Sequence, residues 1–243
     1  MKSFALASIL CCFAFAVSAV AAGQSSPGKA APTEPQNQAA LPSAQPQPAA
    51  PKLDEQLFRA IENADTAALA QLLDQGARAD AQNQQGYTPL MGAVAMGHID
   101  MVKLLLDKGA NPALTDKTGR TALDYAAMTG NQEAAWQLID KNAPVNAKDS
   151  DGFTPLMYSM VSHNVDLVNL LLEKGADVEA RDAHGFTSLM AASGGGFADI
   201  VKALLDHGAG VNDKSDDGTT ALALAVGNHH ADVADFLRAK GAQ

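Results

Sequence analysis

The chain has 243 residues, of which 47% are hydrophobic and 18% charged, proportions that suit a soluble protein with a packed core. Its formal net charge is −10, and this acidity disfavours binding to nucleic acid or to anionic lipid surfaces, which require a basic face. A protein partner with a basic patch is favoured instead.

The first 22 residues have the pattern of a secretory signal peptide. Lys2 precedes an apolar run over residues 4–20, and the small residues at 19–23 fit an A-x-A-like cleavage site. The alternative is an uncleaved membrane anchor, but the short span and the single leading charge favour cleavage. We therefore predict that residues 1–22 are a signal peptide, removed by cleavage at or close to Ala22.

Both cysteines of the chain lie in this leader. Cys11 and Cys12 are preceded by Leu and by Cys, where a lipoprotein signal has a small residue. A mature chain without cysteine needs no disulfide in an oxidising compartment, and the absence of an Asn-x-Ser/Thr acceptor disfavours a eukaryotic secretory route. We expect a periplasmic protein, with secretion as the alternative, and no stable membrane insertion after cleavage.

Residues 23–51 differ in composition from the rest of the chain. They are rich in Pro, Gln, Ala and Ser, include seven prolines and contain almost no large apolar residue. This composition predicts a disordered, partly polyproline-like linker. A passive spacer is the simpler interpretation, and a docking site for a proline-binding partner is the alternative.

From residue 85 onward one phrase recurs at a fixed interval. Its clearest copy is Gly152-Phe153-Thr154-Pro155-Leu156-Met157, and each copy follows the previous one by 33 residues. The threonines of the five copies are Thr88, Thr121, Thr154, Thr187 and Thr220. A period held over five copies predicts an array of small repeated supersecondary units.

Each unit carries signals for two helices. The Thr is typical of an N-cap, and the Pro that follows it in two copies suits the first helical position. A second helix is indicated by apolar residues at helical spacing, with an acid near its start. It is predicted to end at Gly or Asn, the residues that most readily adopt a left-handed conformation. These stop residues are Gly76, Gly109, Asn142, Gly175, Gly208 and Gly241. The polar stretch that follows predicts a short hairpin turn between units.

The period, the Thr-Pro-Leu-like helix start and the Leu-Leu-x-x-Gly-Ala helix end together resemble the ankyrin repeat over residues 52–243. The resemblance implies an all-α repeat fold, a solenoid of about six helix-turn-helix units joined by short hairpin turns. One departure is plain, because the family's usual His after Thr-Pro-Leu is absent from all five copies. Its position holds Met91, Asp124, Met157, Met190 and Ala223. We expect the hydrogen bonds of that His to be absent or replaced, with Met filling the space by apolar contact.

The predicted ankyrin-repeat domain divides into six units. Their bounds are 52–84, 85–117, 118–150, 151–183, 184–216 and 217–243. The first unit lacks the Thr-Pro-Leu start, so it is interpreted as a degenerate N-terminal cap, since a terminal repeat needs a polar outer face. In the last unit Asp235, Arg238 and Lys240 indicate a polar outer side.

No convergent group of catalytic residues is found. A mature chain without cysteine excludes thiol nucleophiles and zinc-thiolate sites. The histidines His98, His163 and His229 fall in the turn between the two helices, and His229 with His230 lacks a second pair at metal-binding spacing. We predict no enzyme activity, no catalytic residue, no cofactor and no metal site.

Two further motifs are interpreted as structural. The run Gly194-Gly195-Gly196 lacks the Lys-Ser/Thr of a phosphate loop, so we predict a turn glycine and a softened helix end. The acidic pairs Asp149 with Asp151 and Asp216 with Asp217 are expected at hairpin tips as solvated turn formers.

The remaining candidate function lies on the surface. The resemblance implies that hairpin tips and first helices line a concave groove, and that the residue before each Thr contacts a partner. Aromatic and Arg residues, which are enriched at binding hot spots, dominate this register. Tyr125 and Tyr158 extend the face if it is exposed, and the alternative is that the rings pack on neighbouring hairpins. The candidate partner-binding residues are Tyr87, Arg120, Tyr125, Phe153, Tyr158 and Phe186. Trp136 is expected to be partly exposed on the opposite, convex face.

These observations lead to one main hypothesis and two alternatives. The main hypothesis is a monomeric, non-catalytic protein-protein interaction module that acts in the bacterial periplasm through its concave groove. The first alternative is an inhibitor or immunity-type protein that occludes a specific enzyme. The second, from another class, is a metal-binding protein or an enzyme.

Overall fold

The computed structural model describes residues 50–243, with side chains from Lys52 onward. The predicted signal peptide and nearly all of the predicted linker lie outside the described residues. Within residues 50–243 there are twelve α-helices in six pairs. The pairs are α2 (Ala50–Glu62) with α3 (Thr66–Asp74), α4 (Pro89–Ala95) with α5 (Ile99–Asp107), α6 (Ala122–Thr129) with α7 (Gln132–Asp140), α8 (Pro155–Ser162) with α9 (Val165–Glu173), α10 (Ser188–Gly195) with α11 (Ala198–Asp206), and α12 (Ala221–Gly227) with α13 (Ala231–Ala239).

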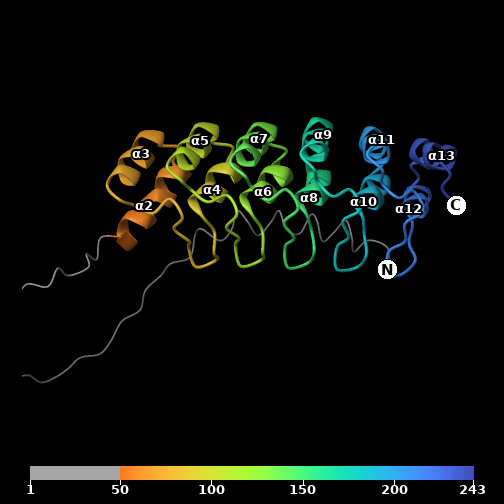
Figure 1. Cartoon of the computed structure of the whole chain (residues 1–243), viewed down its shortest axis with the longest axis horizontal. Helices are drawn as coiled ribbons and strands as arrows, with labels where there is room; N and C mark the ends of the chain where they lie inside the picture. Colours follow the sequence, from red (N-terminus) through yellow and green to blue (C-terminus); the bar gives the residue numbers. More distant parts are fainter. Residues whose placement is uncertain (1–49) are drawn as a thin grey trace, which may run out of the picture. The chain divides into compact units, whose positions relative to one another are not determined.

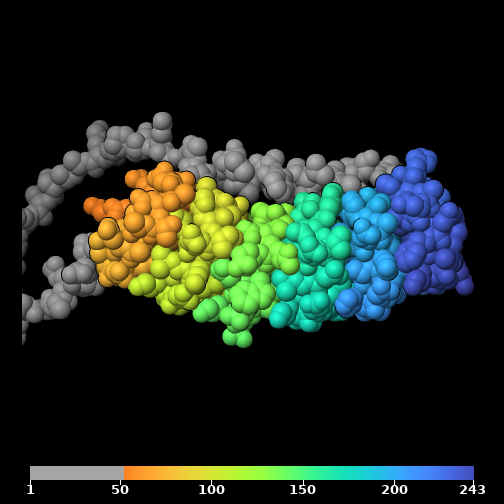
Figure 2. All heavy atoms as spheres, turned by 90° about the horizontal axis from the view of Figure 1, so that it is seen from above, coloured from red at the N-terminus to blue at the C-terminus, as the bar shows by residue number. Residues whose placement is uncertain are grey.

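The pairs stack in chain order, and the result is the all-α repeat array predicted from the period. The first helices form one row, the second helices form another, and the loops between pairs all project on the same side (Figure 1). Seen from above, the units follow one another as successive bands, each beside its neighbours in sequence (Figure 2). Within the described part of the chain, no helix is long and apolar enough to cross a membrane.

The predicted helix starts and stops are confirmed. The five Thr side chains each accept a hydrogen bond from the backbone N–H three residues later, as an N-cap does. All six predicted stop residues have a positive φ, from 64° at Asn142 to 94° at Gly208. These two local devices fix where the Thr-capped first helices begin and where the second helices end, so the 33-residue period becomes a period in space.

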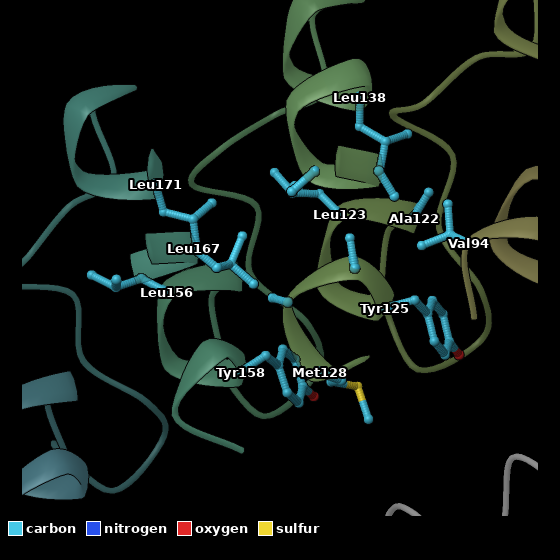
Figure 3. Close-up of a cluster of buried hydrophobic side chains, with 14 of the residues drawn as sticks. Val94, Ala122, Leu123, Tyr125, Met128, Leu138, Leu156, Tyr158, Leu167 and Leu171 are labelled. Carbon is cyan, nitrogen blue, oxygen red and sulfur yellow. The ribbon is translucent and has the colours of Figure 1, made fainter. Parts of the chain in front are cut away.

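The core runs along the array between the two rows of helices. Five Leu residues in the same register of successive first helices are buried, and each second helix buries at least one apolar side chain. The five are Leu57, Leu90, Leu123, Leu156 and Leu189. Figure 3 shows Leu123 and Leu138 of one unit in the same buried cluster as Leu156, Leu167 and Leu171 of the next. Because each unit buries its apolar face against its neighbours, burial of apolar area between units carries much of the stability.

The two end units differ from the middle ones. α2 begins at Ala50, two residues before the predicted domain boundary, and is longer than the other first helices. Asp54, which is 6% exposed, accepts hydrogen bonds from the backbone N–H and the guanidinium of Arg78. In the last unit Asp235, Arg238 and Lys240 are exposed as predicted, but α12 also leaves Val226 48% exposed.

Candidate protein-interaction surface

The hairpins hold one residue of each unit in an equivalent place. We call Tyr87, Arg120, Phe153, Phe186 and Thr219 the hairpin row. Four residues before each member, Asn83, Asp116, Asp149, Asp182 or Ser215 accepts a hydrogen bond from its backbone N–H. In the clearest case Asp149 Oδ1 accepts from the N–H of Asp151 and of Phe153, both at 2.9 Å. This Asx turn is a backbone-fixing device, and its repetition sets the row.

Neighbouring hairpins are joined directly by their backbones. The N–H of Ser150 donates to the carbonyl of Thr118 at 2.9 Å, and equivalent bonds join the other hairpin tips. Gly119 has a φ of +85°, and a Cβ there would lie 3.0 Å from the Cα of Asp149 in the next hairpin. Glycine is therefore needed both for the turn and for the close approach. The hairpin row is thus continuous from one unit to the next.

The members of the hairpin row are half-buried. The Tyr87 hydroxyl donates to the Met91 carbonyl at 3.1 Å, and its ring meets the Tyr125 ring edge to face, with centroids 5.2 Å apart. The Phe153 ring lies 5.5 Å from the ring of Tyr158. Phe153 and Phe186 both pack against the core cluster while keeping part of their surface exposed. Each ring therefore packs internally on one side and faces solvent on another.

Tyr125 and Tyr158 do not extend this exposed face. They are 7% and 6% exposed, so the condition on which they were expected to contact a partner is not met. The Tyr125 hydroxyl donates to Asp116 Oδ2 at 2.6 Å, and the Tyr158 hydroxyl donates to Asp149. Burial, and the acceptor carboxylate in second place, raise the pKa of both tyrosines, so both remain protonated donors. These two hydrogen bonds connect the second hairpin to α6 and the third hairpin to α8.

Asp149 therefore has a different role from the one predicted. It was expected to be a solvated turn former beside Asp151, but its side chain is 1% exposed, while Asp151 is exposed. One of its oxygens organises its own hairpin and the other accepts from Tyr158. At the other acidic pair, Asp216 and Asp217 are both exposed, as predicted.

Arg120 is drawn into the same buried network. Its Nε donates to the Tyr158 hydroxyl at 2.8 Å and lies 3.8 Å from Asp149 Oδ2. The guanidinium carbon is 5.4 Å from the centroid of the Tyr158 ring, within the range of a cation–π contact. With its side chain 14% exposed, Arg120 links the second hairpin to Asp149 of the third hairpin and to Tyr158 of the fourth unit more than it faces a partner.

The position of the missing family His is filled in two ways. Met91, Met157 and Met190 are buried, which confirms the expected apolar filling, and the Sδ of Met91 also accepts from the Thr88 N–H. Asp124 instead fills the position with a side chain that accepts hydrogen bonds. Its Oδ2 accepts from the backbone N–H and the hydroxyl of Thr121, at 2.7 and 2.8 Å. Thr121 and Asp124 thus form a reciprocal capping box.

Next to the hairpin row, a partner can reach the exposed side chains of the hairpin tips. The exposed tip residues include Gln85, Lys117, Ser150, Asp151, His184, Asp216 and Asp217. Among these residues the second hairpin carries the basic Lys117 and the fifth carries the acidic pair Asp216 and Asp217. On the second-helix row, Trp136 is 49% exposed, which confirms its expected exposure.

Over residues 50–243 no group of His, Cys, Asp and Glu is placed to hold a metal ion. One hollow of about 360 Å³ lies between α2 and α3. Another, of about 380 Å³, is lined by residues that include Thr66 and His98. Neither hollow contains a member of the hairpin row.

Asp116 and Asp149 were not predicted from the sequence as partners of Tyr125 and Tyr158. A signal for them exists, since in both copies the Asp lies five residues before the Thr and the Tyr four after it. The other units lack one or both members of this pair. The coincidence of Asp and Tyr in the same two copies could therefore have predicted the contact.

Comparison with known proteins agrees with the architecture. The sequence model of the family described as ankyrin repeats, in three copies, matches residues 57–149, 112–182 and 179–243. No curated protein matches the chain. The family match covers most of the described helices, and its period, caps and paired helices are those of the structure. The chain belongs to the ankyrin-repeat family.

Proposed function

We propose that this protein is a non-catalytic binding module that recognises a protein partner through the hairpin row and the adjoining hairpin tips. Ankyrin repeats are typically non-catalytic modules for protein-protein interaction. The observation that carries the proposal is the continuity of the row, because backbone hydrogen bonds join successive hairpins and fix its spacing. A surface already held in one conformation loses little conformational entropy on binding.

The burial of the side chains in and around the hairpin row reduces the number of candidate partner-binding residues. Tyr87, Phe153 and Phe186 keep exposed surface and are the proposed aromatic anchors. Tyr125 and Tyr158 are buried. Their proposed role is only to pack against Tyr87 and Phe153, respectively. Acidic tips such as Asp216 and Asp217 favour a partner with a basic patch. An inhibitor that occludes a basic enzyme surface remains the alternative within the same class.

The expected location is a separate part of the proposal. A leader over residues 1–22 would direct the protein to the periplasm, with residues 23–49 as a spacer before the repeats. Support comes from the composition of these segments alone. Intact-mass measurement of the exported protein tests it, because a species that retains Cys11 and Cys12 contradicts processing.

The decisive experiment compares a double substitution with a matched control. Replacing Phe153 and Phe186 by Ala is expected to weaken binding of a partner captured by crosslinking to the wild-type protein by at least about tenfold, since hot-spot truncations typically cost about 2 kcal/mol or more. Lys103→Ala, on an exposed position of α5, is expected to leave affinity unchanged.

Thermal unfolding of each variant separates binding from packing. The proposal requires that the double variant keep its fold, with a loss of affinity larger than any loss of stability predicts. Unchanged affinity, or a loss fully explained by unfolding, would place the interface elsewhere.

A further inference from the structure

Asp124 is a charged residue type at a repeat position that is apolar in the neighbouring units. The same position of the other middle units holds Met91, Met157 and Met190, each at most 4% exposed. Asp124 is 0% exposed, in the first turn of α6. A carboxyl group therefore occupies a site that the neighbouring units fill with an apolar side chain, and burial of its charge is costly unless the charge is fully paired.

The pairing of this carboxyl group is incomplete. Oδ2 accepts the two hydrogen bonds from Thr121, but Oδ1 is buried and has no hydrogen-bond partner within the described chain. Oδ2 already accepts two hydrogen bonds. In the neutral form of the Asp124 carboxyl group, the proton is therefore on Oδ1. Loss of that proton to solvent leaves an ionised oxygen without a donor.

The elements around Asp124 offer little compensation. α6 packs against α4, α7 and α8. α4 and α8 contain no charged residue, and Glu133 and Asp140 of α7 are exposed. From the hairpins, Asp149 repels the charge of Asp124 and Arg120 attracts it. Arg120 also interacts with Asp149 and donates a hydrogen bond to Tyr158. Asp116 accepts a hydrogen bond from Tyr125.

The balance favours the protonated form near neutral pH. Burial, as the largest cause, raises the pKa of Asp124 to about 7, and repulsion by Asp149 adds to the rise, while the hydrogen bonds from Thr121 and the charge of Arg120 lower it. In an opened or unfolded chain the pKa of Asp returns to about 4. The proton thus binds more tightly to the closed form, and the stability it contributes is present below pH 4 and is lost progressively as the pH rises towards 7.

We propose that Asp124 is a built-in pH-responsive group whose deprotonation loosens the junction between the second and third units. The segment that loosens begins at Thr121, whose N–H and hydroxyl are bound to Asp124, and includes Arg120 of the hairpin row. Neutral or alkaline conditions therefore favour a more open hairpin at this junction, and acidic conditions favour a closed one.

Amide hydrogen exchange at several pH values, corrected for the intrinsic rate, tests the proposal on the whole chain. Protection of residues 116–126 is expected to fall by up to about tenfold for each pH unit between 5 and 7 and to level off above, because one pKa unit corresponds to a tenfold change in the equilibrium. Carbon-13 titration of the Asp124 carboxyl in the wild-type protein supplies a second readout that needs no variant.

Two variants and a control complete the test. Asp124→Met, which copies the residue of three other units, and Asp124→Asn are each expected to remove the pH dependence of these amides. Asp151→Ser, at an exposed acid, is expected to keep it. A carboxyl that titrates near pH 4, or an Asp124→Met profile equal to that of the wild type, would overturn the proposal.

Discussion

Single residues in the loops between second helices and hairpins decide how adjacent units are joined. At four of these junctions a side chain accepts a hydrogen bond from a backbone N–H 31 residues later. The acceptor and donor pairs are Asp80 with Asn111, Asn146 with Asp177, Glu179 with Gly210, and Asn212 with Gln243. At the remaining junction the acceptor position holds Ala113 and the donor position holds Pro144, which has no N–H. Acceptor and donor are absent together, so no backbone donor is left unpaired.

This pairing leads to a prediction at the residue scale. Asn146→Ala is expected to cost about 1 kcal/mol, because it removes the acceptor of the Asp177 N–H and the donor to the Gly175 carbonyl. Ala113→Asp is expected to bring no matching gain, since Pro144 offers no donor. Urea unfolding of both variants checks the pair, and a clear stabilisation by Ala113→Asp would contradict the interpretation.

At the scale of the element, each hairpin and the first helix that follows it form one structural piece. Tyr125 and Tyr158 project from α6 and α8 towards the hairpin side of the array (Figure 3), where their hydroxyls reach Asp116 and Asp149. The same two acids hold the Asx turns of their hairpins. A helix, a hairpin and a buried acid are therefore fixed together in the second and third hairpins.

The matched tyrosines allow a sharp comparison. Tyr125→Phe and Tyr158→Phe should each destabilise the protein by roughly 1–3 kcal/mol, because each leaves a buried carboxylate oxygen without its donor. Tyr158→Phe should cost more, since the Arg120 Nε also loses its acceptor. Denaturant unfolding at one pH measures both values, and an equal loss in the two variants would show that the bond from Arg120 contributes nothing.

At the scale of the whole molecule, stability comes from contacts between units, and the last unit has a neighbour on one side only within the described chain. The effect appears at equivalent positions of successive first helices. Val94 is fully buried, Ala127 and Met160 are buried, and Val226 is 48% exposed. The same apolar residue thus contributes differently according to its place in the array.

Val94→Ala is accordingly expected to cost roughly 1–3 kcal/mol by leaving a cavity between units. Val226→Ala, at the same position of the last unit, should stay within about 0.5 kcal/mol of the wild type. Thermal or urea unfolding of the two variants measures both losses of stability. If the exposed substitution proved as costly as the buried one, the face of α12 would have to be covered in solution.

Much of the fold was determined by the sequence alone, because its signals are local and repeated. A Thr such as Thr154 caps a helix through an N–H three residues away, and Asn142 ends one through its own φ, so neither needs knowledge of the rest of the chain. Their constant spacing then predicted the number of units and the stacking.

The tertiary structure alone decided which of the candidate residues face solvent. Tyr125 and Tyr158 are aromatic and close to the hairpin row in sequence, yet they turn inward because Asp116 and Asp149 are there to accept their hydroxyls. The burial of Asp124 likewise depends on the packing of α4 and α8 against α6, where it replaces the Met of neighbouring units. Exposure and pairing are set by contacts between residues far apart in the chain, and a 33-residue period specifies the place of a side chain without specifying its neighbours.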